Sequence, residues 1–423
     1  MAKAFNTTKV LKITAALAVM LSLVGYVVDG IVLPHKWWYA TDFSWYYYGA
    51  KVGARGGDFY DGATMKEAAR SAGEPDEVIK FDFYFTYPPF FVIFMRPFLL
   101  FSHARARILW LFLNNGLYAL AIILCIAALR ERISFFEAAA MAFAALNFNP
   151  VFRNLFMGQI NVVTFFLLAL ALYAFKHKAD YPAGALLGLA AMIKVLPGLF
   201  IVYFLFKRRW KVVMGAALAA VFLLIISLAL LGIEPHKAYI FQRIPAMVSK
   251  PLSYEDNHSL AAFFYRLFGY RFKGEAFFHN GTLARIFSSS IALLFLAMSF
   301  LITGRAIGND HLRWNLDLAL FALTVNIISP LTWEFHMVWL MLPVITLIHY
   351  LFTRSAHPGS RPVFIFLFLT AYIVLAARFP GHHPAFQSGV LVLLISIKLY
   401  AMILWWALLG LAIRRLTKKG QSL

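Results

Sequence analysis

Long apolar runs separated by short polar loops dominate the chain. An apolar run of about 17 to 25 residues can cross a membrane as a helix, and shorter runs can do so where other helices shield their ends. About twelve runs fit this description: residues 10–28, 88–101, 108–129, 135–148, 161–175, 182–206, 212–231, 283–302, 314–328, 336–352, 362–377 and 388–413. Because a helix satisfies its own backbone hydrogen bonds in lipid, the pattern predicts an all-α polytopic membrane protein.

Two polar stretches, residues 30–87 and 232–281, are much longer than the other loops. Lys and Arg gather in the short loops and at the termini, and such residues stay on the cytoplasmic side of membrane proteins. With twelve spans, both termini are then cytoplasmic, and both long stretches lie on the outer side of the cell membrane. Arg130 and Arg132 would also fall outside, against this rule, so the topology of residues 130–161 stays open.

The first long stretch has the pattern of an interfacial element. Residues 43–52 and 64–72 are short amphipathic segments separated by glycines. Trp37, Trp38 and Tyr39 precede them, and such aromatic residues suit the headgroup layer of a membrane. We expect two short helices lying at the membrane surface.

The composition supports a membrane protein and excludes other classes. Of 423 residues, 62% are hydrophobic and only 14% are charged, and the length fits one membrane-embedded domain covering residues 1–423. The net charge of +20 follows from the basic loops, and no basic-aromatic module is present, so we expect no nucleic-acid partner. Cys125 is the single cysteine, which rules out an intrachain disulfide.

Several acids and aromatics of the first long stretch are candidates for chemistry. Asp42 comes at the start of the first interfacial helix, where an Asp can cap the helix or serve as a catalytic group. Asp58 and Asp61 fit turn and cap positions. Tyr87 precedes two prolines, which favour a rigid start of the next helix, and it can also line a pocket.

Polar residues within the apolar runs are a second group of candidates. Lys194 lies in the run 182–206, where a lysine is costly; it either has a function, with a phosphate as a natural partner, or reaches the interface along its stem. Gln159 and Asn161 can join helices by hydrogen bonds or bind a substrate. Gly184 and Gly188 predict close helix packing.

A third group lies near the outer ends of later runs. Asn257 and His258 belong to the second long stretch, and Glu334 and His336 lie at a membrane edge. A buried structural histidine and a substrate-binding one are both compatible with this pattern. No metal-binding, phosphate-loop or dinucleotide-binding motif is present, so we expect no metal and no other cofactor, and nucleotide sugars are disfavoured as donors.

Taken together, these segments resemble glycosyltransferase family 87 of the membrane-embedded GT-C superfamily. The family includes polyprenol-phosphate-mannose-dependent mannosyltransferases and arabinofuranosyltransferase relatives. The resemblance spans residues 40–345, and its stretches are Asp42-Phe43 to Tyr48, Gly57 to Asp61, Tyr87-Pro88-Pro89, Gly158 to Asn161, Gly184 to Pro197, Asn257 to Leu260 and Ser329 to His336.

The resemblance implies a GT-C-type fold and an inverting transfer of a sugar, mannose or a pentose such as arabinose. The donor would be a polyprenyl-phosphate sugar, and the acceptor a lipid or a glycan on the extracytoplasmic face. By position Asp42 is the general base, and His336 is a candidate for the donor phosphate. Glu334 departs from the family pattern and either shares or competes for the base role. The other candidate substrate-binding residues are Lys194, Asn257, His258, Tyr87, Tyr47, Gln159 and Asn161.

Two other functions fit part of the pattern. A lipid or solute transporter or flippase would explain Lys194, but internal repeats are absent and the long outer stretch would be unexplained. A glycan polymerase or ligase that uses polyprenyl pyrophosphates is the other alternative.

Overall fold

The computed structural model describes residues 7–36, 41–80, 82–129, 132–249, 253–268, 278–305, 311–353, 358–381, 383–386 and 389–421. Within these ranges every regular element is a helix, and pairing of β type is limited to an isolated bridge between Asn257 and Trp333. The all-α prediction is therefore confirmed. The expected interfacial aromatics Trp37, Trp38 and Tyr39 lie outside the described residues.

The first part of the chain comprises α1 (Thr7–Val27), η1 (Val28–Val32), α2 (Leu33–Lys36), α3 (Thr41–Ala54), α4 (Gly62–Arg70), α5 (Asp76–Ile79), α6 (Phe90–Met95), η2 (Arg96–Leu100), α7 (His103–Ala127), α8 (Phe135–Leu146), α9 (Asn149–Met157), α10 (Asn161–Lys176), α11 (Asp180–Ile193), η3 (Leu196–Gly198) and α12 (Leu199–Phe206).

The second part comprises α13 (Trp210–Leu231), α14 (Glu234–Ala238), η4 (Tyr239–Arg243), α15 (Ile244–Ser249), α16 (Leu260–Phe268), α17 (Gly281–Thr303), α18 (His311–Ile328), η5 (Glu334–Leu340), α19 (Met341–Phe352), η6 (Pro358–Ser360), α20 (Arg361–Ala376), η7 (Pro384–Phe386), η8 (Gly389–Ser396) and α21 (Ile397–Gln421).

Six helices in the described part are long and apolar enough to cross a membrane, and a bent pair, α8 with α9, brings the number to seven. Five further apolar helices have 10–17 residues. The expected runs thus appear as helices, but the run 182–206 is not continuous, because it divides into α11 and α12 around Lys194. The bend of 41° between α8 and α9 falls in the segment whose topology the sequence left open.

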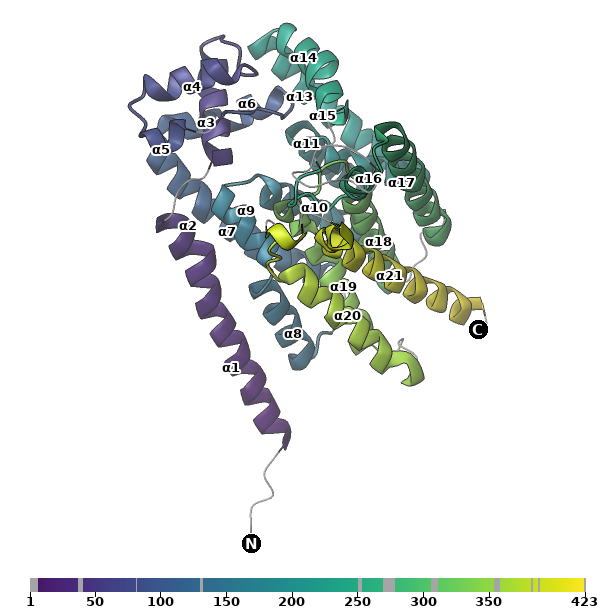
Figure 1. Cartoon of the computed structure of the whole chain (residues 1–423). Helices are drawn as coiled ribbons and strands as arrows, with labels where there is room; N and C mark the ends of the chain where they lie inside the picture. Colours follow the sequence, from purple (N-terminus) through teal and green to yellow (C-terminus); the bar gives the residue numbers. More distant parts are fainter. Residues whose placement is uncertain are drawn as a thin grey trace.

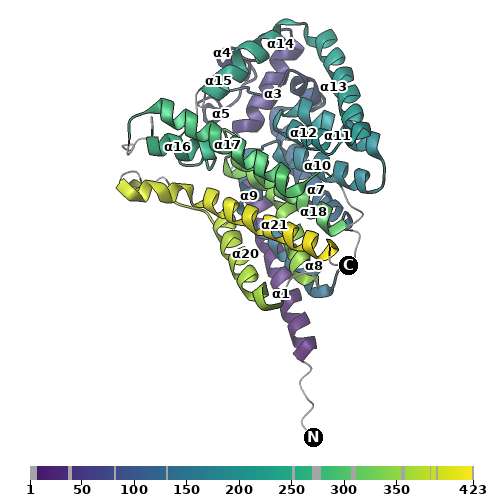
Figure 2. The same ribbon diagram turned by 90° about the vertical axis from the view of Figure 1, so that its right-hand side faces the viewer.

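The short helices α3 to α5 gather at one end of the molecule with α14 and α15, opposite the N-terminal end of α1 (Figures 1 and 2). The two short helices expected over residues 43–52 and 64–72 are present as α3 and α4, and their position at a membrane surface stays a prediction. Asp61 caps α4 by accepting from the backbone N–H of Thr64 at 3.0 Å, and Asp58 accepts from Tyr60 N at 2.8 Å, as expected for cap and turn residues.

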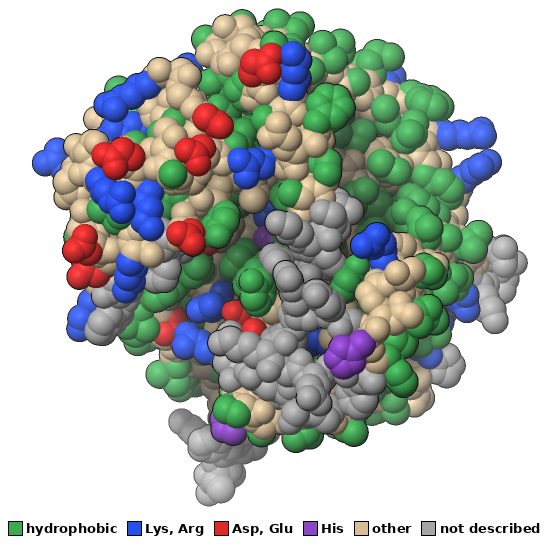
Figure 3. Space-filling model, turned by 45° about the horizontal axis from the view of Figure 1, so that its top comes forward, with side chains coloured by type: hydrophobic (Ala, Val, Ile, Leu, Met, Phe, Trp, Pro, Cys, Tyr) green, Lys and Arg blue, Asp and Glu red, His purple; other side chains and the backbone are tan. Residues whose placement is uncertain are grey.

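Charged side chains gather over this end, while hydrophobic side chains cover much of the opposite side of the same face (Figure 3). The long helices expose apolar side chains such as Leu21 on α1 and Phe222 on α13, as lipid-facing helices do. The molecule therefore combines a helical membrane body with a charged cap.

The helices α11 and α13 touch through their backbones. A Cβ atom on Gly184 would lie 2.0 Å from the carbonyl oxygen of Val212, and one on Gly188 would lie 2.5 Å from that of Ala216. Only glycine permits such contact, so the predicted close packing at Gly184 and Gly188 is confirmed. This contact fixes α11, which ends next to Lys194.

Candidate functional site

Helix α3 buries the acid that the sequence singled out. Asp42 lies in the first turn of α3 and is 6% exposed. Tyr46 follows one turn later, and residues four apart share one face of a helix. Both side chains therefore face the core, where Tyr46 packs edge-on against the rings of Tyr87 and Phe91.

A turn with a left-handed residue, Gly158, positions the side-chain amide of Gln159 against the buried face of α3. Helix α9 ends at Gly158, whose φ of +66° favours glycine because it lacks a Cβ atom. The Gly158 carbonyl oxygen accepts a hydrogen bond of 2.8 Å from Trp110 Nε1, which anchors the turn to α7. The next residue, Gln159, is buried, and Asn161 begins α10.

The Gln159 side chain joins the tyrosines to Asn161. Its Oε1 accepts from Tyr46 Oη at 2.9 Å, from Tyr87 Oη at 3.2 Å and from Asn161 Nδ2 at 3.4 Å. Hydrogen bonding by the Gln159 side chain also lowers the pKa of the neighbouring Asp42 carboxyl, which places the Gln159 amide beside that acid. Gln159 is thus oriented to hold Asp42.

The end of helix α11 at Lys194 brings a cation next to Gln159 and Asn161. Pro197 has no N–H to bond the carbonyl of Ile193, so α11 cannot continue, and Lys194 takes an extended conformation with φ −150° and ψ 128°. Its Nζ donates to Asn161 Oδ1 at 2.6 Å and lies 5.9 Å from the centre of the Tyr87 ring. The predicted residues Asp42, Tyr87, Gln159, Asn161 and Lys194 therefore meet in one network, which we call the Asp42 network and which also includes Tyr46.

The carboxylate of Asp42 is poorly compensated. Among the residues that the structure describes, its Oδ2 has no hydrogen-bond partner. Burial raises the pKa of Asp42 to about 7, against the opposing effects of the Gln159 hydrogen bond and the positive charge of Lys194. A carboxyl with this pKa can take up and release a proton near neutral pH, as a general base must.

His336 lies beside the network. Its Nδ1 is 3.0 Å from the Leu331 carbonyl oxygen and 3.3 Å from the Trp333 amide nitrogen. One turn further, Trp339 Nε1 donates to Thr164 Oγ1 at 3.2 Å, and Thr164 is one turn from Asn161 on α10. The charge of Lys194 acts on His336, so the two residues lie within electrostatic range.

Glu334 belongs to a different cluster. Lys398 Nζ contacts its Oε1 at 2.5 Å, and on its Oε2 Asn149 Nδ2 donates at 3.1 Å while Arg153 Nε lies at 3.7 Å. Arg378 supports the cluster by donating to Asn149 Oδ1 at 3.1 Å. We call these five residues the Glu334 network. Its carboxylate is paired on both oxygens, which argues for a framework role and against the base role.

Asn257 and His258 lie against the loop that precedes Glu334. Asn257 donates to the Pro330 carbonyl oxygen at 3.1 Å and accepts from Thr332 N at 2.9 Å, while His258 N donates to Thr332 O at 2.8 Å. Burial lowers the pKa of the His258 imidazole well below its usual value, which keeps it neutral. These contacts shape the loop, and substrate binding by either residue stays a prediction.

Tyr47 lies in another network from that of Asp42. Its hydroxyl donates to the Phe101 carbonyl oxygen at 2.9 Å, and its ring centre is 5.3 Å from that of His103. His103 Nδ1 lies 3.1 Å from Glu74 Oε2, and its Nε2 lies 3.1 Å from Ser44 Oγ. This arrangement holds α3 against α7, so the structure gives Tyr47 a place in the support of α3.

Five residues of these networks, namely Tyr46, Asn149, Arg153, Arg378 and Lys398, were missed in the sequence, although two of them carried a signal. Tyr46 is four positions after Asp42, and helical spacing would have selected it over Tyr47. Lys398 lies within the apolar run 388–413 and is fully buried, so the reasoning applied to Lys194 also applied to it. Neither Asn149 nor Arg153 carries such a signal. Over the described ranges, His, Cys, Asp and Glu form no group of three that could hold a metal ion.

Comparison with known proteins assigns the family. The model of glycosyltransferase family 87 matches residues 85–330. The chain belongs to glycosyltransferase family 87. The matched segment of this family 87 chain includes Tyr87, Gln159 and Lys194, whereas Asp42 and His336 lie outside it.

Curated proteins resemble this family 87 chain at 27–28% sequence identity. It is 28% identical over 283 residues to the polyprenol-phosphate-mannose-dependent alpha-(1-2)-phosphatidylinositol pentamannoside mannosyltransferase of Mycolicibacterium smegmatis, covering 65% of this chain and 63% of the relative. It is 27% identical over 291 residues to the protein of the same name from Mycobacterium tuberculosis, covering 68% of this chain and 63% of the relative. The chain thus spans less than two thirds of the length of these relatives. No solved structure matches it, so the GT-C-type arrangement stays a prediction.

Proposed function

We propose that the protein is a membrane-embedded glycosyltransferase that moves a sugar from a polyprenyl phosphate to a lipid or glycan acceptor, with inversion. Mannose is the preferred sugar, because the relatives are named as polyprenol-phosphate-mannose-dependent enzymes. Their names also give a phosphatidylinositol mannoside as acceptor, which makes a lipid-linked glycan the first acceptor to test.

The observation that carries the proposal is the Asp42 network. Separate segments of the chain supply a buried acid, an amide that holds it and a cation. Burial raises the pKa of Asp42 to about 7, a value suited to a base at neutral pH. A polar network of this kind is costly inside a membrane protein, and such clusters commonly mark functional sites.

The proposed reaction is a single displacement. The acceptor hydroxyl oxygen attacks the anomeric carbon of the donor sugar while Asp42 takes the hydroxyl proton. The bond between the anomeric carbon and the phosphate oxygen breaks, and its electron pair leaves with the polyprenyl phosphate. The phosphate is already a good leaving group, so one base suffices, in contrast to the paired acids of most glycoside hydrolases.

Lys194 and His336 are proposed to stabilise the departing phosphate. The Lys194 ammonium lies within the network, 2.6 Å from Asn161 Oδ1, and its charge acts on His336. Charge that develops on a leaving group in a buried site is stabilised strongly by cations fixed in advance. His336 has its Nδ1 beside backbone groups, which leaves Nε2 to meet the phosphate.

The active site is proposed to face the extracytoplasmic side of the cell membrane. Side chains of both charges cover the end that contains α3 to α5, whereas the short loops rich in Lys and Arg, such as residues 207–211, are the ones that the positive-inside rule assigns to the cytoplasm. The proposed displacement requires no metal and no other cofactor.

Purified protein in nanodiscs tests the function directly. Polyprenyl phosphate carrying radiolabelled mannose is supplied with a phosphatidylinositol mannoside, and labelled lipid products are separated. The proposal expects transfer of label to the acceptor with release of polyprenyl phosphate. Label that crosses the bilayer of a proteoliposome unchanged would instead establish a transporter, and transfer only from a pyrophosphate-linked donor would establish the polymerase or ligase alternative.

A further inference from the structure

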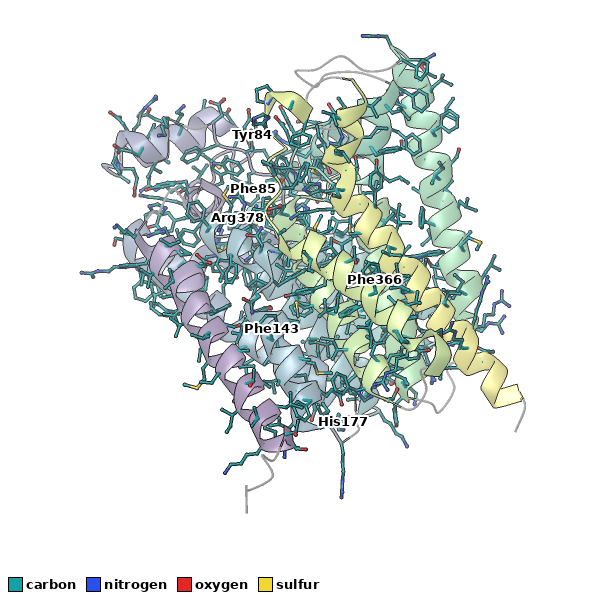
Figure 4. The ribbon with its side chains drawn as sticks, turned by 60° about the horizontal axis from the view of Figure 1, so that its bottom comes forward. Tyr84, Phe85, Phe143, His177, Phe366 and Arg378 are labelled. Atoms are coloured by element: carbon teal, nitrogen blue, oxygen red, sulfur yellow. The ribbon has the colours of Figure 1, made fainter. Side chains whose placement is uncertain are left out.

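A cavity of about 470 Å³ lies in the charged end of the molecule, outside the Asp42 network. It opens between the start of α4, residues 82–86 and the end of η4, and its size is typical of sites for small ligands. The lining residues that matter for its chemistry are Tyr60, Asp61, Lys66, Asp82, Tyr84 and Arg243. Figure 4 shows Tyr84 and Phe85 of this wall far from His177, which lies toward the opposite end of the molecule.

The walls of the cavity are held by close contacts. A Cβ atom on Gly62 would lie 2.4 Å from the Phe83 carbonyl oxygen, so glycine allows the start of α4 to touch residues 82–86. Arg243 Nη2 donates to the Tyr60 carbonyl oxygen, and its guanidinium lies 5.2 Å from the Tyr60 ring centre. The cavity is thus held in shape by contacts between two segments of the first long stretch and Arg243, which is far from them in the sequence.

The charge of the lining favours an uncharged ligand. Two acids, Asp61 and Asp82, face two cations, Lys66 and Arg243, and Lys66 Nζ lies 3.7 Å from Asp82 Oδ1. A polyanion would meet carboxylates on two sides, whereas a neutral molecule would not be repelled.

The same lining suits a sugar. Carboxylate oxygens accept from sugar hydroxyls, and guanidinium and ammonium groups donate to them. Tyr84 is 58% exposed, so its ring offers an apolar face to the C–H groups of a sugar. Trp45 supports this ring edge-on, with the ring centres 5.8 Å apart.

An aromatic layer separates the cavity from the Asp42 network. The Tyr60 hydroxyl donates to the Tyr87 carbonyl oxygen at 2.9 Å, and the ring centres of Phe85 and Tyr87 are 5.8 Å apart. Tyr60 and Phe85 are almost fully buried, so a sugar in the cavity cannot present its hydroxyl to Asp42. It can be held there while another part of the same molecule reaches the network.

We propose that this cavity is a subsite for uncharged sugar residues of the acceptor that are remote from the reacting hydroxyl. The proposal rests on the proposed function, because it assigns the cavity to the acceptor of that reaction. It makes the cavity a determinant of acceptor length: acceptors with several sugars use it, and acceptors with one sugar do not.

Kinetics with acceptors of two lengths test the proposal. The variants Tyr84→Ala and Asp82→Asn are compared with Tyr181→Ala and Asp76→Asn, which change an exposed tyrosine and an exposed acid outside the cavity. We expect the cavity variants to raise the KM for a pentamannosylated acceptor about tenfold, with kcat, donor KM and the KM for a monomannosylated acceptor within twofold of the parent protein. An equal rise for both acceptors, or no rise for either, would overturn the subsite.

A binding measurement separates this proposal from the proposed function. Asp42→Asn protein is titrated with a soluble uncharged mannopentaose, and saturation-transfer NMR detects the contact. Binding that disappears in Tyr84→Ala supports the subsite even if no variant transfers sugar, in which case the proposed function alone fails. Normal transfer without mannopentaose binding, or binding of inositol phosphate in its place, contradicts the subsite and leaves the proposed function standing.

Discussion

Asp42 is buried and Glu334 is half-buried; both acids lie near the start of a helix, yet their surroundings differ. Glu334 is paired with Lys398 at 2.5 Å and Arg153 at 3.7 Å, and Asn149 donates to it as well. Asp42 has an amide partner in Gln159, and one of its oxygens lacks a partner among the described residues. Full pairing stabilises a charge and makes it unreactive, whereas partial pairing leaves a carboxylate ready to take a proton.

Replacing the two acids gives the largest expected contrast. Asp42→Asn should lower kcat/KM by about 10³-fold or more, since a positioned base contributes roughly 10² to 10⁴. Glu334→Gln should lower kcat/KM by about tenfold or less, because both carboxylate oxygens of Glu334 are already paired with groups of the protein. Radiolabelled transfer in nanodiscs measures both, and a larger loss in Glu334→Gln than in Asp42→Asn would move the base role to Glu334.

Removal of the cation tests the other half of the Asp42 network. Lys194→Met should lower kcat by about 10²-fold, since fixed charges that stabilise a leaving group contribute about this much. Lys194→Arg should retain part of the activity. Lys237→Met is the matched control, because Lys237 is an exposed lysine paired with Glu234 on α14. Equal losses in the two methionine variants would contradict a phosphate-binding role for Lys194.

The thermal stability of the two acid variants, Glu334→Gln and Asp42→Asn, should change in opposite directions. Glu334→Gln leaves Lys398 buried without its anion, which should lower the free energy of unfolding by about 3 kcal/mol. Asp42 has a raised pKa in the folded state, so folding loses stability as pH rises from its unfolded value of 3.8 to about 7. Asp42→Asn should therefore raise the melting temperature by a few degrees at pH 8. A lower melting temperature would indicate that Asp42 serves to cap α3.

Loss of the amide that holds Asp42 should have a smaller effect. Gln159→Leu should lower kcat about tenfold and raise the apparent pKa of the rate profile, because the Gln159 hydrogen bond lowers the pKa of Asp42. Gln242→Leu is the control, since Gln242 is exposed on η4. A change in rate with an unchanged pH profile would show that Gln159 acts on the packing of the site and does not act through Asp42.

The pH dependence of the parent protein tests whether Asp42, and not Glu334, is the group that takes the proton. A base works in its deprotonated form, so kcat/KM should rise with pH up to about 7 as Asp42 loses its proton. Below that value it should fall about tenfold per pH unit, and this limb should persist in Glu334→Gln. A flat profile between pH 5.5 and 8.5 would exclude Asp42 as the titrating group.

The sequence predicted which residues belong to the site better than it predicted how the helices arrange them. Gln159 and Lys194 were selected because polar groups are rare and costly among apolar runs, and Asp42 because it starts a helix of the first long polar stretch. The predicted span 182–206 is interrupted at Lys194 because Pro197 has no N–H and α11 therefore ends before it. The apolar pattern alone did not predict this interruption. Lys398 was missed although its run carried the same signal.

The partners of Glu334 were beyond sequence reasoning for another reason. Asn149 and Lys398 are far apart in the chain, and their meeting depends on how α9, η5 and α21 pack. No local pattern encodes that packing. The sequence therefore left open whether Glu334 competes with Asp42 for the base role. The three nitrogen groups around the Glu334 carboxylate argue against that role.

The glycine contacts between α11 and α13 also limit how a lipid substrate arrives. Backbone atoms of these helices meet at Gly184, Gly188 and Gly215, which leaves no gap wide enough for a hydrocarbon chain. A polyprenyl tail cannot slide in from the bilayer between them. Its lateral path toward Lys194 must open on another flank of α11, so lipid crosslinkers should label that flank and spare the glycine seam.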